Sequence, residues 1–123
     1  MNTYVTASAD PQPVFRALAD PTRRQILQHL QHEDMTIGEV TEHFDITRAA
    51  IKKHLNILEE GQLIYVEVRG RERINHFRGD GLETAAQWID YFGNFWDERL
   101  MSLKDAIEND KQRKQNRNKR NNP

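Results

Sequence analysis

The 123-residue sequence predicts a mainly α fold with a small β-hairpin, a winged helix-turn-helix whose terminal helices form a dimer interface. Apolar residues recur at helical spacing as far as Gly61. The period then changes to two on either side of Arg69-Gly70-Arg71, which indicates a hairpin. A short helix, a tight turn and a longer helix precede that hairpin.

Each predicted helix before the turn has a recognisable start. Residues 13–20 place apolar side chains on one side of a short helix. Asp20 and Pro21 then predict a new helix, with Asp as the N-cap and Pro at the first helical position. Thr36 and Glu39 have the spacing of a capping box and open a short helix.

The second half of the chain follows the same logic. Thr47 is the expected N-cap of the next helix, and Gly61 stands where that helix should stop. Residues 82–110 predict one long helix, and Gly93 inside it costs about 1 kcal/mol relative to alanine. We therefore expect a flexible N-terminus (1–12), a winged helix-turn-helix domain with a C-terminal dimerisation helix (13–110) and a disordered basic tail (111–123).

The net charge of −1 hides an uneven distribution. Residues 1–110 carry twelve Lys and Arg against nineteen Asp and Glu, whereas residues 111–123 carry six basic residues and no acidic one. Residues 47–78 carry seven basic and four acidic side chains. The middle of the chain is thus a positive segment in an acidic body, so any surface that binds nucleic acid must be local.

Several classes of function are disfavoured by what the sequence lacks. It has no cysteine, which excludes disulfides and thiolate metal sites. It has no apolar run of about 18 residues and no signal peptide, so we expect a cytoplasmic protein with no membrane contact. No catalytic triad order or phosphate-binding loop is present, so we expect neither an enzyme nor a cofactor.

The helix after Thr47 has the two faces that a recognition helix needs. Ile51, Leu55 and Leu58 form its apolar stripe, and polar and basic residues occupy the opposite side. Arg48 can donate two hydrogen bonds to guanine, and Asn56 suits adenine. Lys52, Lys53, Arg69 and Arg71 are better suited to phosphates. The alternatives are a solvated basic face or a module that binds an acidic protein.

The last helix carries more large apolar groups than a small monomer can cover. We expect a dimer interface there, with a plain monomer core or a pocket for an apolar inducer as alternatives. The predicted interface residues are Val14, Phe15, Leu18, Trp88, Phe92, Phe95, Trp96, Leu100 and Leu103.

The segments ALADPTRRQILQHL, TIGEVTEHFDITRAAIKKHLNILEEGQLI and RGRERINHF together resemble the ArsR/SmtB-type winged-helix repressors over residues 14–78. The ending WIDYFGNFWDERLMSL is similar to a subgroup without a metal site, autorepressor-like or encoded beside START/SRPBCC-type proteins. The resemblance implies a homodimer that represses transcription at an inverted-repeat operator in double-stranded DNA. The DNA-binding set that we predict is Thr36, Thr47, Arg48, Ala49, Lys52, Lys53, His54, Asn56, Arg69, Arg71 and Arg73.

The departures from that family pattern concern its metal sensors and its operators. Those sensors use Cys in the helix-turn-helix or His and carboxylates on the last helix, and residues 82–110 contain no His. We therefore expect no metal site. Many members carry Ser-Gln-x-x-x-Ser where this chain has Thr47 to Lys52, so the operator cannot be transferred from relatives. A small apolar ligand or a partner protein stays open as the effector.

Overall fold

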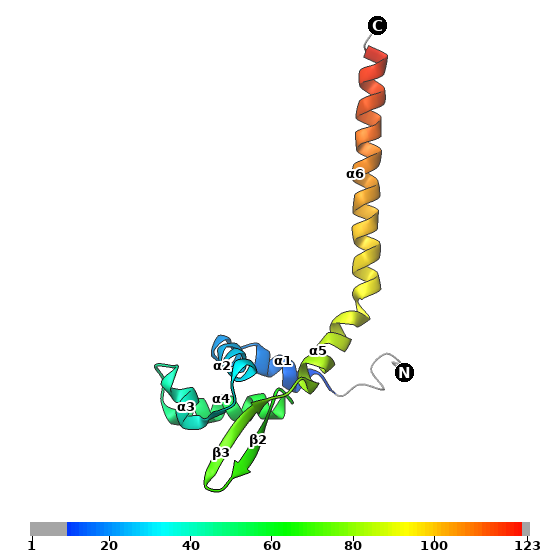
Figure 1. Cartoon of the computed structure of the whole chain (residues 1–123). Coiled ribbons are helices and arrows are strands. Elements are labelled where there is room, and N and C mark those ends of the chain that lie inside the picture. Colours follow the sequence, from blue (N-terminus) through cyan, green and yellow to red (C-terminus); the bar gives the residue numbers. More distant parts are fainter. Residues whose placement is uncertain (1–9, 122–123) are drawn as a thin grey trace. The chain divides into compact units, whose positions relative to one another are not determined.

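The computed structural model describes residues 10–121, without the side chains of residues 94, 96 and 119–121. The chain divides into two compact units between Trp88 and Ile89, and Figure 1 shows the ribbon. Most of the expected flexible N-terminus, residues 1–9, lies outside the described residues. Within residues 10–121, none of the helices combines the length and apolar character that a membrane span requires.

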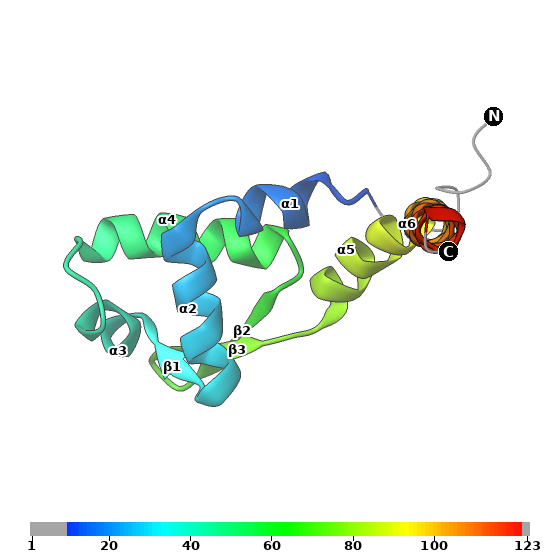
Figure 2. The ribbon, with the colours of Figure 1, turned by 90° about the horizontal axis from the view of Figure 1, so that it is seen from above.

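The first unit has the predicted order of elements, with one short strand added (Figure 2). The winged helix-turn-helix fold is thereby confirmed. Its elements are α1 (Gln12–Leu18), α2 (Pro21–His32), β1 (Met35–Thr36), α3 (Ile37–Glu42), α4 (Arg48–Glu60), β2 (Ile64–Arg69), β3 (Glu72–Phe77) and the greater part of α5 (Asp80–Tyr91).

The three predicted N-caps are confirmed. A carboxylate oxygen of Asp20 accepts a hydrogen bond from the Arg23 N–H at 3.0 Å at the start of α2. Thr36 and Glu39 form both bonds of a capping box at the start of α3. The Thr47 hydroxyl accepts the Ala50 N–H at 3.1 Å, which begins α4. These caps satisfy backbone donors that have no partner inside their own helices.

The strands form one antiparallel sheet in the order β1-β3-β2. In the β2–β3 hairpin, Ile64 pairs with Phe77 at the base and Arg69 with Glu72 at the end. Gly70 has a φ of 64°, which a glycine adopts without strain at the first position of a two-residue turn. The sequence did not predict β1, because two residues are too short to show a period.

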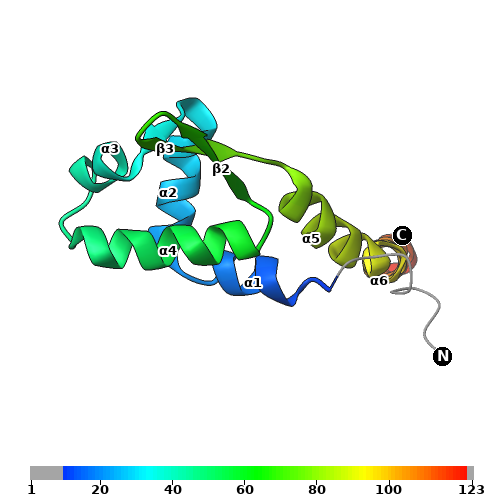
Figure 3. The same ribbon diagram turned by 90° about the horizontal axis from the view of Figure 1, so that it is seen from below.

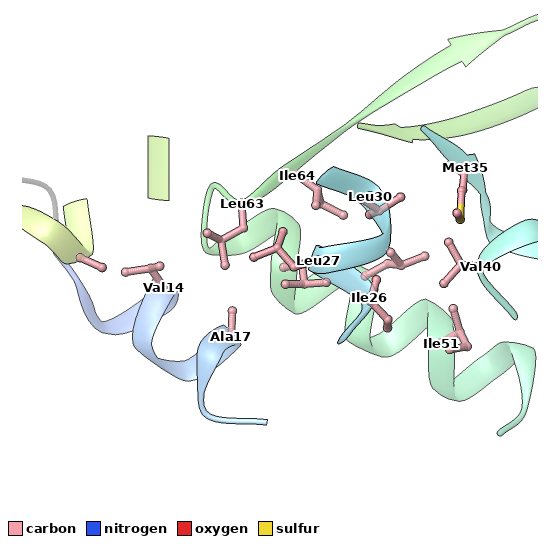
Figure 4. Close-up of a cluster of buried hydrophobic side chains, with 13 residues drawn as sticks. Val14, Ala17, Ile26, Leu27, Leu30, Met35, Val40, Ile51, Leu63 and Ile64 are labelled. Atoms are coloured by element: carbon pink, nitrogen blue, oxygen red, sulfur yellow. The ribbon is translucent and has the colours of Figure 1, made fainter. Parts of the chain in front are cut away.

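The core of the first unit lies where α1, α2, α3 and α4 meet the base of the hairpin (Figure 4). Every helix contributes its apolar stripe, and Leu63 and Ile64 bring the start of β2 into the same cluster. The buried set is Val14, Ala17, Ile26, Leu27, Leu30, Met35, Val40, Ile51, Leu55, Leu58, Leu63, Ile64 and Ala85.

Gly61 ends α4, as predicted, although for a different physical reason. Its φ is −78°, and the left-handed residue is its neighbour Gln62, with a φ of 60°. A Cβ at Gly61 would lie 3.0 Å from the Pro13 carbonyl oxygen and 3.3 Å from the Ala17 Cβ. Gly61 is thus required by the close approach of α1.

The second unit corrects two predictions about the C-terminal region. The expected single helix over residues 82–110 is interrupted at Phe92, and α6 (Gly93–Asn121) begins there. The Phe92 N–H bonds the Ile89 carbonyl, so the last turn of α5 tightens just before a glycine that favours a break. Residues 111–121, expected to be disordered, continue α6. They contain neither Gly nor Pro, and Lys114 pairs with Asp110 one turn earlier at 3.2 Å.

Candidate nucleic-acid interface

α3, the connection at residues 43–47 and α4 form the helix-turn-helix. Figure 3 shows α4 along its length, with α3 near its N-terminal end and the hairpin on the same side. Ile51, Leu55 and Leu58 are buried, so they fix the rotation of α4 about its axis. That rotation leaves the opposite face exposed: Arg48, Ala49, Lys52, Lys53 and Asn56.

The exposed cations of α4 and the hairpin are available to a ligand. Within residues 10–121, no ion pair holds Arg48, Lys52, Lys53, Arg71 or Arg73. Arg69 differs, because its guanidinium bonds a carboxylate oxygen of Glu67 at 2.9 Å. The structure therefore separates Arg69 from the other predicted cations, which have no ion pair among the described residues.

Two predicted contact residues, Thr36 and Thr47, also serve as caps. Each hydroxyl oxygen accepts a backbone N–H, at 3.2 Å for Thr36 and 3.1 Å for Thr47. A hydroxyl that accepts in this way still has its own hydrogen to donate. Arg48 follows Thr47, and its Nη1 lies 3.9 Å from the point where a Cβ would stand at Gly38. The Arg48 guanidinium thus lies beside the first turn of α3.

His54 is mostly buried, with 21% of its side chain exposed, so it is a packing residue more than a surface one. Its Nδ1 lies 3.2 Å from Nη1 of Arg23 on α2. The same Nδ1 lies 4.0 Å from a carboxylate oxygen of Asp20, so His54 stands beside the helix cap as well. This contact joins the N-terminal end of α2 to the middle of α4.

The Arg23 side chain on α2 contacts both α1 and α4, a role that the sequence alone does not indicate. Its Nε donates to the Ala17 carbonyl at 2.9 Å and its Nη2 to the Arg16 carbonyl at 2.8 Å. These carbonyls belong to α1, so one guanidinium links α1, α2 and α4. Its backbone N–H lowers the pKa of the Asp20 carboxyl through the capping hydrogen bond. The Asp-Pro-Thr-Arg segment therefore has a structural role: it caps α2 and links α2 to α1 and α4.

Arg23→Lys should lower the free energy of unfolding by about 1–2 kcal/mol, because a lysine cannot reproduce the three-way guanidinium contact. Thermal unfolding followed by circular dichroism measures the change. Arg24→Lys is the matched control, since Arg24 makes a single bond to the Leu18 carbonyl, at 2.6 Å, that a lysine can replace. An equal loss of unfolding free energy in the two variants would contradict the linking role of Arg23.

His76 on β3 connects the hairpin to Asp34, which precedes β1, and no local sequence pattern indicates this contact. Its Nδ1 lies 3.0 Å from Asp34 and its Nε2 2.8 Å from Glu67, and the ring stacks on Tyr65 with centroids 4.7 Å apart. The hydrogen bond with His76 holds the pKa of Glu67 below its ordinary value. Buried Asn75 adds a bond from Nδ2 to the Met35 carbonyl at 3.1 Å. The hairpin base is thus held on both faces.

The predicted interface residues of α1 do not share one environment. Val14 is only 2% exposed, so it belongs to the core of its own unit, and its prediction as a dimer-interface residue is corrected. Phe15 and Leu18 are half-buried against that core, and the Phe15 ring meets Trp88 edge-on at 6.4 Å. Val14 and Leu18 both fit a helical stripe, and only the packing distinguishes them.

The predicted interface residues after Trp88 belong to the second unit. Phe92 and Phe95 are 37% and 47% exposed, and the Arg99 guanidinium lies 4.9 Å from the Phe95 ring centroid. Leu100 and Leu103 are exposed on α6, whereas the side chain of Trp96 lies outside the described part. Among the described side chains, no group of three or more His, Asp or Glu is placed to hold a metal ion.

A capped helix-turn-helix, an exposed cationic face on its second helix and a basic hairpin define a winged helix-turn-helix DNA-binding regulator. Comparison with known proteins agrees. A family model described as a helix-turn-helix domain matches residues 18–67. The transcriptional repressor SdpR of Bacillus subtilis is 38% identical over 87 residues, which cover 71% of this chain and 97% of SdpR.

Solved structures extend the comparison to the fold. An ArsR-like transcriptional regulator from Rhodococcus sp. RHA1 is 34% identical with a TM-score of 0.65, over 76% of this chain and 89% of that one. The homodimeric winged helix-turn-helix domain Mb0332 from Mycobacterium bovis has a TM-score of 0.53 at 22% identity, over 72% and 80% of the two chains. This chain belongs to the ArsR family of winged-helix transcription regulators. The matched relatives are regulators and not enzymes.

Proposed function

We propose that the protein is a homodimeric, sequence-specific repressor that binds an inverted-repeat operator. The exposed face of α4 enters the major groove, and the hairpin contacts the neighbouring backbone. The observation that carries this proposal is the set of exposed cations on α4 and the hairpin that have no ion pair among the described residues. In an otherwise acidic body, such a surface attracts phosphates locally.

The contact residues divide by their chemistry. Arg48 reads a guanine edge, supported by the hydroxyl of Thr47, and Asn56 suits adenine. The exposed methyl of Ala49 suits a thymine methyl group. Positions that bind phosphate set orientation and salt dependence, and we assign four of them: Lys52, Lys53, Arg71 and Arg73.

Dimerisation is supported by the apolar stripe of α6. Leu100, Leu103 and Ile107 follow one another at helical spacing and are 62%, 58% and 48% exposed. Three large apolar side chains in a row on an exposed helix favour a covering partner. Mb0332, which has the same fold, is homodimeric. Two copies would set their α4 helices about one DNA turn apart, roughly 34 Å, which suits an inverted repeat.

We propose that repression needs no metal ion and takes place in the cytoplasm. The chain has no thiolate, and α6 offers carboxylates without histidine, a donor set poorly suited to zinc. SdpR is a transcriptional repressor, and repression is carried over to this chain on that likeness.

Arg48→Ala and Lys53→Ala should weaken operator binding in different ways. Arg48→Ala should cost about 1–3 kcal/mol on the operator and relax the preference at one base pair, because it removes a bidentate base contact. Lys53→Ala should weaken binding to all duplexes alike and reduce the salt slope by about 1. Mobility shifts with the DNA upstream of the gene, at several salt concentrations, measure both effects.

A duplex of the same composition in shuffled order is the control for sequence preference. Equal affinity for the two duplexes at physiological salt would contradict sequence-specific repression. A uniform loss in Arg48→Ala, with the base preference intact, would reassign Arg48 to a phosphate.

A further inference from the structure

A groove with a volume of about 390 Å³ lies between α4 and the hairpin. It falls in the size range of small-molecule sites. One wall is α4, the other is the face of the hairpin that carries Val66 and Asn75, and Ile37 at the start of α3 closes one side. We propose that this groove binds a small amphipathic carboxylate, with an aryl or alkyl body, and that its binding displaces DNA.

The charges in the groove are arranged for an anion. Arg48 and Lys52 from α4 and Arg73 from the hairpin line it, against one carboxylate, Glu59. Arg48 and Glu59 are eleven residues apart on α4, about 16 Å along the helix axis, so the carboxylate lies at the opposite end of this wall from Arg48. No ion pair within residues 10–121 neutralises any of the three cations.

The rest of the lining is apolar, and this sets the class of ligand. Leu55, Val66 and Ile37 contribute aliphatic surface beside the cations, and Asn56 and Asn75 add amide groups. A bare phosphate gains nothing from aliphatic surface. A carboxylate on an aryl or alkyl body uses both parts of the groove, the cations for its charge and the aliphatic side chains for its body.

The regulatory consequence rests on the proposed function. Arg48, Lys52 and Arg73 are also the side chains that we assign to operator contacts, so one groove cannot serve both partners at once. An acid bound there would relieve repression by direct competition, with no change of fold. This site differs from the pocket for an apolar inducer that is the alternative to a dimer interface on the last helix.

The test uses 2-naphthoate as the probe and the full chain without DNA. Amide NMR titration should show saturable shifts of the Asn56 and Asn75 side-chain amides, with a Kd of about 1 mM or tighter. The neutral analogue 2-naphthalenemethanol should bind at least about tenfold more weakly, because it lacks the charge-assisted bonds.

Arg73→Gln should weaken naphthoate binding about tenfold. Arg71→Gln is the charge-matched control, because Arg71 is an exposed residue of the same hairpin outside the groove lining, and it should leave the naphthoate Kd unchanged. Shifts confined to other residues, no saturable binding, equal Kd values for the two variants or equal binding of the alcohol would each overturn the site.

The operator experiment separates this inference from the proposed function. At constant ionic strength, the apparent Kd for the operator should rise in proportion to naphthoate without reaching a plateau, as competition requires. Unchanged operator affinity at saturating naphthoate would overturn the regulatory role. Loss of sequence preference without naphthoate would contradict repression and leave the NMR evidence for the groove standing.

Discussion

Gly81→Ala is expected to lower the free energy of unfolding by about 3 kcal/mol or more and the melting temperature by roughly 10–20 °C. A Cβ at residue 81 would overlap the carbonyl oxygen of Gly61 and stand 3.0 Å from both the Gln62 carbonyl and a Leu63 methyl. The Gly81 N–H also bonds the Gln62 carbonyl at 2.8 Å. Two of these obstacles are backbone atoms, which cannot rotate away as a side chain can.

Calorimetry of the purified variant measures the loss, and Gly79→Ala is the control. Among the described residues, nothing lies within 4 Å of a Cβ placed at Gly79, which is exposed and two positions earlier. Gly79→Ala should therefore stay within about 0.5 kcal/mol of the native chain. Similar melting temperatures for the two variants would show that α5 does not need its close approach to Gly61.

The double substitution Leu100→Glu with Leu103→Glu should convert the proposed dimer into a monomer and reduce operator affinity about 100-fold. Both side chains are more than half exposed on α6, so two new carboxylates there cost little in a single chain. In a dimer they would be buried among apolar groups without partners, which is strongly unfavourable. Sedimentation equilibrium and mobility shifts measure the two effects.

The control keeps the added charge and moves it away from the stripe. Ser102→Glu with Asn109→Glu adds the same two carboxylates at exposed positions of α6 outside the stripe. This variant should stay dimeric. An intact dimer in the Leu100 and Leu103 variant would remove α6 from the interface, and a monomeric control would show a general effect of negative charge.

Local chemistry explains why the helix starts could be predicted from sequence. A cap depends on residues three apart, so Asp20, Thr36 and Thr47 identify their helices without knowledge of the fold. The hairpin is local in the same sense, since Gly70 meets the requirement for a positive φ at its turn. Charge patterning likewise predicted the segment that carries the exposed basic side chains, residues 47–78.

Features that depend on distant parts of the chain could not be predicted in this way. Arg23 and His54 are 31 residues apart, and nothing in their local sequence indicates that they touch. Val14 and Leu18 fit the same stripe, yet one is buried in the core and the other half-exposed. The groove between α4 and the hairpin depends on the placement of β3, which pairs with both β1 and β2.

The continuous course of α6 also determines how two such helices can pair. Residues 93–110 carry five acidic and two basic side chains, and residues 111–121 carry six basic and no acidic ones. α6 is therefore a rod with opposite charges at its two ends. A parallel pair would set like charges side by side, whereas an antiparallel pair sets each basic end beside the acidic part of its partner. The charge pattern thus selects the antiparallel orientation for a dimer built on this helix.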